Sequence, residues 1–166
     1  MKEVKKKLNI LCFIGSRAEY YIVRALFIKL SNIENINLEL IVSGSITSEP
    51  NQKTLKDIDH DQLKINQTIV IPPDHKDHSE VIGHLCLNLS SLIRSFSPDL
   101  CIVYGDRYES FAFAISATHV NSIILHIEAG DITEGGTYDD YIRHCITKMS
   151  HLFCTSTILG KSIVAR

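Results

Sequence analysis

Short apolar runs alternate with stretches in which apolar residues recur at helical spacing. The apolar runs predict strands at residues 8–14, 38–42, 68–71, 100–104, 123–127 and 152–155. The helical spacing predicts helices at residues 18–30, 79–96, 107–119 and 139–149, and another from Thr157 onward. Residues 45–66 are polar and acidic, and predict only a short helix. Strands separated by helical crossovers predict an α/β fold with a doubly wound parallel sheet.

Length and composition agree with one folded domain. The chain has 166 residues, of which 45% are hydrophobic and 22% charged. A chain of this size can bury a substantial core, and its composition excludes disordered, collagen-like and coiled-coil classes.

Charge and hydropathy limit the partners. With 17 Lys and Arg against 19 Asp and Glu, the formal charge is −2, so no overall basic field exists for nucleic acid or an anionic membrane. No apolar stretch approaches the roughly 18 residues of a membrane span. The lysine-rich start precedes an apolar run of only seven residues without a small-residue cleavage pattern, which argues against a signal peptide. We therefore expect neither a nucleic-acid nor a membrane partner.

The five cysteines are an odd set without a C-x-x-C pair. Four of them fall in segments that we predict to be buried. Unpaired, buried thiols are typical of a reducing compartment, so we expect a cytoplasmic protein.

Ionisable residues follow three of the predicted strands. The first strand is followed by Arg17, the fourth by Asp106 and Arg107, and the fifth by Glu128. Ligands of open parallel sheets bind at the carboxyl ends of the strands, where these residues should converge. Guanidinium groups recognise phosphate, and carboxylates exchange protons, so the set indicates a phosphorylated substrate and acid/base chemistry.

The predicted helix at 139–149 adds the pair Asp139-Asp140 at its start and Arg143, which follows Asp139 by four residues and is therefore expected on the same helical face. Less specific interpretations remain open. Asp106 and Asp139 could cap helices, Arg17 could be a solvated first-turn residue, and Glu128 a loop carboxylate. The polar loop at residues 74–78 resembles a metal cluster but precedes a helix, and no metal is predicted. His126, inside a strand, is interpreted as a hydrogen-bonded core histidine.

Nucleotide-binding glycine motifs are absent, since the sequence has neither G-x-G-x-x-G after the first strand nor G-x-x-x-x-G-K-[ST]. Four other segments occur in order. They are Gly15-Ser16-Arg17-Ala18-Glu19-Tyr20, Gly105-Asp106-Arg107-Tyr108-Glu109, His126-Ile127-Glu128-Ala129-Gly130-Asp131 and the stretch DDYIRHCITKMSH at residues 139–151. Together they resemble the UDP-N-acetylglucosamine 2-epimerases. The last stretch, with the arginine at 107, is more similar to the hydrolysing branch that feeds sialic acid synthesis.

The resemblance implies one Rossmann-like half of a glycosyltransferase-B type two-domain fold. It matches the N-terminal half of that family, so residues 1–166 are expected to be a single N-terminal domain without the C-terminal nucleotide-binding domain. The family eliminates UDP to form a glycal and then adds water, which yields N-acetylmannosamine. No cofactor is implied, the partner is a UDP-sugar, and we also expect a homo-oligomer.

The same resemblance assigns roles by motif. It implies that Asp106, Glu128 and Asp139 are catalytic carboxylates. It places Arg17 beside the diphosphate and Arg107 and Arg143 near the substrate. The chain departs from the family pattern at other positions (Tyr21, Ala129 and Asp131), which leaves the choice of sugar open.

Two alternatives remain. One is a non-hydrolysing epimerase, which would retain UDP on the epimerised sugar. The other is a non-catalytic module for nucleotide-sugar binding or assembly. The second alternative predicts that the apolar stripe of the helix at 79–96, formed by Val81, Ile82, Leu85, Leu89, Leu92, Ile93 and Phe96, includes exposed residues.

Overall fold

The computed structural model describes residues 7–133, 136 and 138–165. Residues 1–6, which include most of the lysine-rich start, lie outside this range. The described strands are β1 (Leu8–Ile14), β2 (Ile36–Val42), β3 (Lys64–Thr68), β4 (Leu100–Tyr104), β5 (Ile124–Ile127) and β6 (Leu152–Cys154). They form one sheet in the order β3-β2-β1-β4-β5-β6, with every pair parallel. This arrangement confirms the predicted doubly wound α/β fold.

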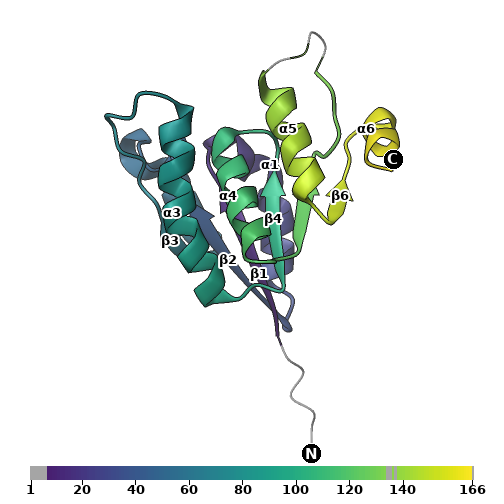
Figure 1. Ribbon diagram of the computed structural model, residues 1–166. Coiled ribbons are helices and arrows are strands. Elements are labelled where there is room, and N and C mark those ends of the chain that lie inside the picture. The colour runs from purple at the N-terminus through teal and green to yellow at the C-terminus, as the bar shows by residue number, and fades with distance from the viewer. Residues whose placement is uncertain (1–6, 134–135, 137, 166) are drawn as a thin grey trace, which may run out of the picture.

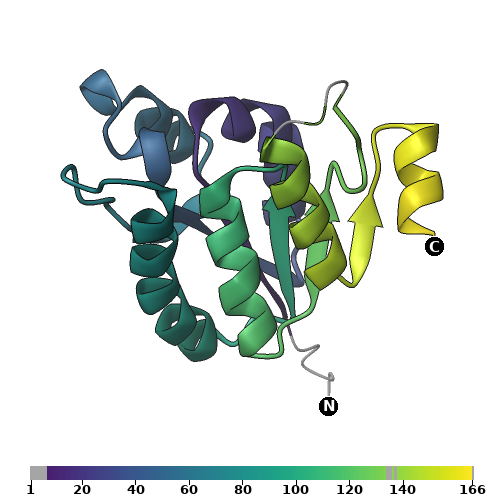
Figure 2. The ribbon, with the colours of Figure 1, turned by 45° about the horizontal axis from the view of Figure 1, so that its top comes forward.

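Helices cover both faces of this sheet. They are α1 (Arg17–Ser31), α2 (Lys53–His60), α3 (His78–Phe96), α4 (Tyr108–His119), α5 (Tyr138–Met149) and α6 (Ile158–Val164), with two short 3-10 turns at Gly44–Ile46 and Pro50–Gln52. Figure 1 shows α3, α4 and α5 in front of the sheet and α1 behind it. In Figure 2 the carboxyl ends of the strands come forward, and α6 lies beside the edge strand β6.

Alternate residues of each central strand enter different cores. Leu11 and Phe13 of β1 pack with α3, α4 and α5, and Phe13 stacks on Phe113 with a ring-centroid distance of 5.4 Å. Ile10 and Cys12 face the opposite core beneath α1 and α2. Both faces of β1 are thus buried, which explains its unbroken apolar sequence.

The apolar stripe of α3 belongs to the core. Val81, Leu85, Leu89 and Ile93 are fully buried, and the three other members of the predicted stripe (Ile82, Leu92 and Phe96) are half-buried against the same cluster. The exposed stripe residues expected of an assembly module are therefore not found.

The third strand was predicted at the wrong place. The apolar residues at 68–71 predicted it, but β3 runs from Lys64 to Thr68. It lies at the edge of the sheet and is stabilised by polar partners, because Asn66 donates to the Glu39 carboxylate on β2 at 2.6 Å and Lys64 pairs with the same group. Ile69 follows the strand and is buried against α3.

The acidic run at residues 57–61 joins α2 to α1. Arg24 donates two hydrogen bonds to Asp61, at 2.5 and 2.6 Å, and Tyr20 donates another. The hydrogen bonds from Arg24 lower the pKa of Asp61 to about 2. This part of the sequence, which gave no clear pattern, is thus held by ionic contacts instead of a long apolar stripe.

The expectation that four cysteines are buried was wrong. Cys12 and Cys101 are buried and Cys86 is half-buried, but Cys145 and Cys154 are exposed, and all five are free thiols. Cys154 is exposed because β6 is an edge strand. No described helix combines the length and apolar character needed to cross a bilayer.

Candidate functional site

The strand order reverses between β1 and β4, the two central strands. The chain leaves β1 toward α1 on one face and leaves β4 toward α4 on the other. A crevice at such a reversal is where doubly wound sheets bind ligands. Arg17 begins α1 just after β1, and Asp106 and Arg107 lie in the loop after β4, so the structure places predicted site residues on both sides of this point.

Two predicted arginines line one hollow here, which we call the arginine hollow. It measures about 480 Å³ and is lined by Ser16, Arg17, Ala18, Ser45, Ser48, Glu49, Pro50 and Arg107. An adjoining hollow of about 430 Å³ brings Lys53 and Lys56 beside Arg17. Four cations from three segments thus surround connected space with one lining carboxylate, Glu49, which is a suitable environment for a phosphorylated ligand.

Arg17 is exposed at the first position of α1, while the preceding Ser16 caps the helix by accepting from the Glu19 amide. The Glu19 side chain turns back and accepts from the Gly15 amide at 2.8 Å. Burial raises the pKa of Glu19, and the nearby Glu109 charge adds to this effect. These contacts fix the loop that presents Arg17.

Asp106 does not cap α4. The N-cap is Arg107, whose side chain makes no capping bond. Instead Asp106 pairs with Arg143, whose guanidinium also donates to Asp140 at 2.8 Å. The Arg143 side chain is only 9% exposed and that of Asp106 25%, so the arginine lies behind a carboxylate that remains accessible.

Arg143 and Asp139, which were predicted to share a helical face, do not form an ion pair. Arg143 contacts Asp140, three residues earlier, while Asp139 is exposed in the first turn of α5. Burial opposes ionisation of Asp140, but hydrogen bonds from Thr133 and the Arg143 charge outweigh it and lower its pKa. No side-chain hydrogen bond or ion pair connects Asp139 to another described residue.

Glu128 follows β5 directly and has a φ of 70°, in the left-handed region that residues with side chains seldom adopt. Such strain often accompanies a functional position. Tyr104, at the end of β4, donates to the Glu128 carboxylate, and the negative charges of Asp106 and Glu19 act on the same hydroxyl. Burial and these carboxylates together raise the pKa of Tyr104. Glu128 and Asp106 therefore converge near Tyr104.

His126 is a buried core histidine, as predicted, with 0% exposure. Its Nε2 lies 2.8 Å from the Gly105 carbonyl, which only accepts, so Nε2 carries the hydrogen. Its Nδ1 lies 3.0 Å from the Thr147 hydroxyl on α5. Burial lowers the pKa of His126 to about 4. The neutral ring thus ties the Asp106 loop to α5.

Sequence reasoning missed Glu19, Tyr104 and Glu109 as members of the site. Tyr104 ends an apolar run and resembled any other core residue. Glu109 and Glu19 resembled first-turn helix carboxylates, although both are buried. Buried carboxylates need partners, but the partners become evident only from the tertiary structure.

The loop at 74–78 has structural contacts. Asp77 caps α3 by accepting from the amides of Ser79 and Glu80 at 2.8 and 3.1 Å. His78 stacks on Tyr108 with a centroid distance of 3.9 Å. Within residues 7–133, 136 and 138–165, no three His, Cys, Asp or Glu side chains are grouped to hold a metal.

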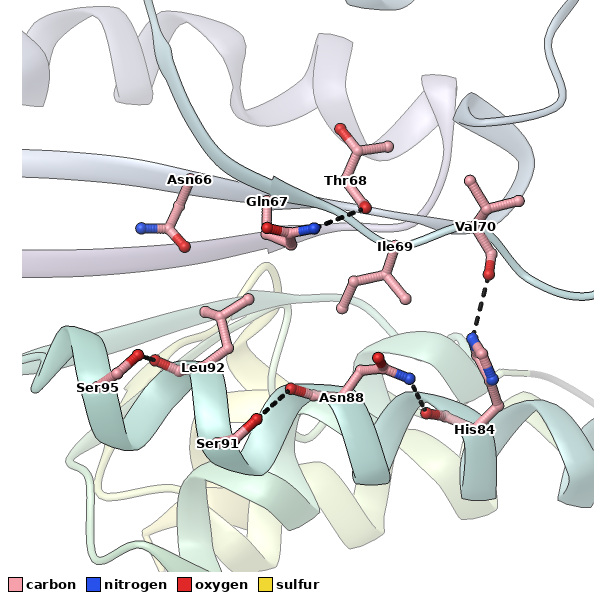
Figure 3. A pocket seen from close by; sticks show the side chains of 10 residues that line it. All are labelled: Asn66, Gln67, Thr68, Ile69, Val70, His84, Asn88, Ser91, Leu92 and Ser95. Atoms are coloured by element: carbon pink, nitrogen blue, oxygen red, sulfur yellow. Dashed lines mark hydrogen bonds between the residues drawn. The ribbon is translucent and has the colours of Figure 1, made fainter.

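A larger hollow lies elsewhere, and we call it the edge groove. It measures about 680 Å³ between β3 and α3 and is lined by Asn66, Gln67, Thr68, Ile69, Val70, His84, Asn88, Ser91, Leu92 and Ser95. Figure 3 shows Asn88, Ser91 and Ser95 along α3, each bonded within its own helix. No carboxylate, lysine or arginine lines it. Size alone therefore does not make it the site of acid/base chemistry.

Comparison with known proteins identifies the family to which the chain belongs. The family described as UDP-N-acetylglucosamine 2-epimerase matches residues 28–164, which is most of the chain. The chain belongs to the UDP-N-acetylglucosamine 2-epimerase family. This confirms the resemblance carried by the four sequence segments.

Two curated relatives of this epimerase family are similar over nearly the whole chain. The polysialic acid biosynthesis protein P7 of Escherichia coli is 38% identical over 152 residues, which cover 90% of this chain and 39% of that protein. UDP-N,N'-diacetylbacillosamine 2-epimerase (hydrolyzing) of Legionella pneumophila is 32% identical over 161 residues, which cover 95% and 42%. The chain thus spans about two fifths of the length of these relatives.

Solved epimerase structures show the same fold. UDP-GlcNAc 2-epimerase from Neisseria meningitidis bound to UDP-GlcNAc superposes with a TM-score of 0.83 at 18% identity, over 95% of this chain and 42% of that one. A putative UDP-N-acetylglucosamine 2-epimerase from Listeria monocytogenes gives 0.83 at 16% identity, over 96% and 42%. The Rossmann-like half of a glycosyltransferase-B type fold is confirmed.

Proposed function

We propose that this chain is the N-terminal domain of a hydrolysing UDP-N-acetylglucosamine 2-epimerase. The reaction would convert the UDP-sugar and water into UDP and N-acetylmannosamine. The observation that carries the proposal is the placement of arginines and carboxylates side by side at the strand reversal. Arg17 and Arg107 line one hollow there, and Asp106 and Glu128 extend from the two adjoining strand ends.

The first step is elimination. A carboxylate removes the proton from C2 of the sugar, the C–H electrons form the C1=C2 double bond, and the C1–O bond breaks to release UDP. Negative charge grows on the departing diphosphate, so arginines on its side stabilise the transition state. Arg17 and Arg107 suit this role because both line the arginine hollow, Arg17 from the start of α1 and Arg107 from just before α4.

The second step is hydration of the glycal. Water adds hydroxyl to C1, and a protonated carboxyl group delivers hydrogen to C2 on the opposite face, which inverts that centre. Proton removal and proton delivery require groups on two sides of the sugar. Asp106, Glu128 and Asp139 come from β4, β5 and α5, so they can approach one ligand from different directions.

The contacts of Arg143 refine its predicted role. Its guanidinium is buried and engaged by Asp106 and Asp140. We therefore assign Arg143 the positioning of Asp106, with Arg17 and Arg107 as the arginines that meet the substrate. Asp139, which is exposed, would act once a ligand covers the start of α5.

The hydrolysing outcome is supported by the relatives' names. Relatives from Legionella pneumophila and Campylobacter jejuni carry the word hydrolyzing, at 32% and 31% identity. Both are named for diacetylbacillosamine, so UDP-N,N'-diacetylbacillosamine is the second substrate to test. A non-hydrolysing reaction is the alternative, because the family name covers both outcomes.

Product analysis tests this proposal. The complete protein, meaning the product of the whole natural reading frame, is incubated with UDP-N-acetylglucosamine in D₂O and the products are analysed by NMR. We expect free N-acetylmannosamine and UDP, with one deuterium at C2. UDP-N-acetylmannosamine as the final product would instead establish the non-hydrolysing reaction, and binding without conversion of either substrate would support the non-catalytic module.

A further inference from the structure

We propose that Glu109 is a positioning residue that orients the Arg107 guanidinium toward the diphosphate of the UDP-sugar. This inference rests on the proposed function, because it requires Arg107 to bind substrate. Glu109 itself is 1% exposed. It would therefore act through the arginine and not by contact with the sugar.

The contact between these residues is bidentate. Arg107 Nε lies 3.1 Å from Glu109 Oε2, and Arg107 Nη2 lies 2.9 Å from Oε1. Two parallel bonds fix the plane of a guanidinium, which a single bond does not. They use two of its five N–H donors and leave three for another acceptor. The Arg107 side chain is 38% exposed, so these donors remain accessible.

Two neighbouring loops hold Glu109 in place. A Cβ atom at Gly44, where φ is 61°, would lie 2.9 Å from Glu109 Oε1. A Cβ atom at Gly15 would lie 3.3 Å from the Glu109 Cβ. The absence of side chains at both glycines lets the loops after β1 and β2 close around the carboxylate. Glu109 thus has little room to leave the position in which it holds Arg107.

A second buried carboxylate completes the arrangement. Glu19 accepts from the Gly15 amide at 2.8 Å and from the Ser110 hydroxyl at 3.2 Å. Burial works against the charge of Arg107, but Glu109 and Glu19 outweigh it and raise its pKa. Arg107 is therefore a permanent cation whose orientation is fixed by Glu109. The next residue, Ser110, bonds to Glu19, which in turn holds the segment that precedes Arg17.

A purely structural ion pair occurs elsewhere and supplies the matched control. Glu39 is 4% exposed and pairs with Lys64 and Asn66 between β2 and β3. It resembles Glu109 in burial and in having a cationic partner. Neither Glu39 nor Lys64 lines the arginine hollow. Loss of the Glu39 charge should lower the stability of the fold without changing the affinity for UDP.

The test measures UDP affinity by calorimetry, and KM and kcat with UDP-N-acetylglucosamine, in the complete protein. We expect Glu109→Gln to weaken UDP binding and raise KM about tenfold, because Arg107 loses the charged carboxylate to which it is hydrogen-bonded. We expect Glu39→Gln to lower the unfolding temperature and leave UDP affinity within about twofold. In an Arg107→Ala background, Glu109→Gln should add little, since its effect passes through Arg107.

Each other outcome has a definite meaning. If Arg107→Ala weakens UDP binding but Glu109→Gln does not, the positioning role is wrong and the proposed function stands. Equal effects of Glu109→Gln with and without Arg107 would also overturn it. If Arg107→Ala leaves UDP affinity unchanged, the substrate-binding role in the proposed function fails as well. Should Glu109→Gln not fold, the same cycle with Glu109→Asp, which keeps the charge but shortens the reach, decides the question.

Discussion

The arginine hollow and the edge groove differ in volume and in the charge of the residues that line them. The edge groove is the larger, about 680 against 480 Å³, but no carboxylate, lysine or arginine lines it, and Asn88, Ser91 and Ser95 bond within α3. The arginine hollow is smaller, yet two arginines line it, and carboxylates follow the adjoining strands. We propose that the chemistry takes place at this sheet edge because the charged groups are brought together at the strand reversal. The volume of a hollow alone does not identify the functional site.

The largest expected effect concerns turnover by the 166-residue chain on its own. This chain spans 39% of the Escherichia coli relative's length, and we propose that a second domain of the complete protein forms the other wall of the arginine hollow. We expect the chain alone to fold, since a chain of this size buries about 70% of its unfolded surface. We expect no appreciable turnover, because the sugar would be neither oriented nor shielded from water.

Coupled measurement of UDP release by the purified 166-residue chain, together with its circular dichroism, checks this expectation. Turnover within about tenfold of 10 per second, a typical enzyme value, would show that the described elements suffice, or that a dimer of this chain supplies the wall.

Asp106→Asn should lower kcat about 100-fold or more in the complete protein, because it removes a proton-transfer group. UDP affinity should change little. Asp140→Asn is the matched control, since it removes the other carboxylate on Arg143 without altering Asp106 itself. An equal loss of kcat in both variants would mean that the Arg143 ion pairs, and not proton transfer, account for the effect.

His126 should make stability depend on pH. Its pKa is about 4 in the folded protein against an ordinary 6.5, so the unfolded chain binds the proton more readily. Its contribution is complete above pH 6.5 and declines as pH falls toward 4, by about 3 kcal/mol in total. Urea unfolding of the wild type and His126→Gln at several pH values measures this. The stability difference should narrow with falling pH, and a constant difference would rule out the neutral buried ring.

Arg17→Ala should weaken UDP binding about tenfold at low ionic strength, through loss of charged hydrogen bonds. The difference from wild type should shrink as salt is added, because Arg17 is exposed and screened. Lys29→Ala, at the other end of α1, is the control and should bind UDP as the wild type does. Unchanged affinity in Arg17→Ala would remove that arginine from the phosphate site.

The smallest effect is expected in the edge groove. Asn88→Ala should change kcat/KM by less than about twofold, because its side chain bonds only to the His84 carbonyl of its own helix. Turnover assays compare it directly with Arg17→Ala. A loss as large as that of Arg17→Ala would reverse the comparison between the two hollows.

The sequence predicted elements well where both faces of a strand are buried. β1 and β4 were placed correctly because their apolar runs coincide with the two central strands. β3 was displaced because an edge strand can be stabilised by polar partners such as Lys64 and Asn66. Periodicity reports burial, so it is least informative where burial is partial.

The candidate site was predictable where a residue follows a strand. Arg17, Asp106 and Glu128 could be placed at one sheet edge from topology alone. The partners of these residues could not be predicted. Arg107 reaches Glu109, two residues on, because Arg107 is extended just before α4 begins. The choice of Asp140 over Asp139 depends on which side of α5 faces the core, and this is set by tertiary packing.

Hydrogen exchange of the complete protein, with and without UDP-N-acetylglucosamine, shows which of the two hollows the substrate covers. We expect slower exchange in peptides that contain residues 15–18, 44–48 and 105–107, which border the arginine hollow. Peptides covering 66–70 and 84–95, which line the edge groove, should exchange as before. Protection of the edge-groove peptides with no change around Arg17 and Arg107 would contradict the assignment of the site.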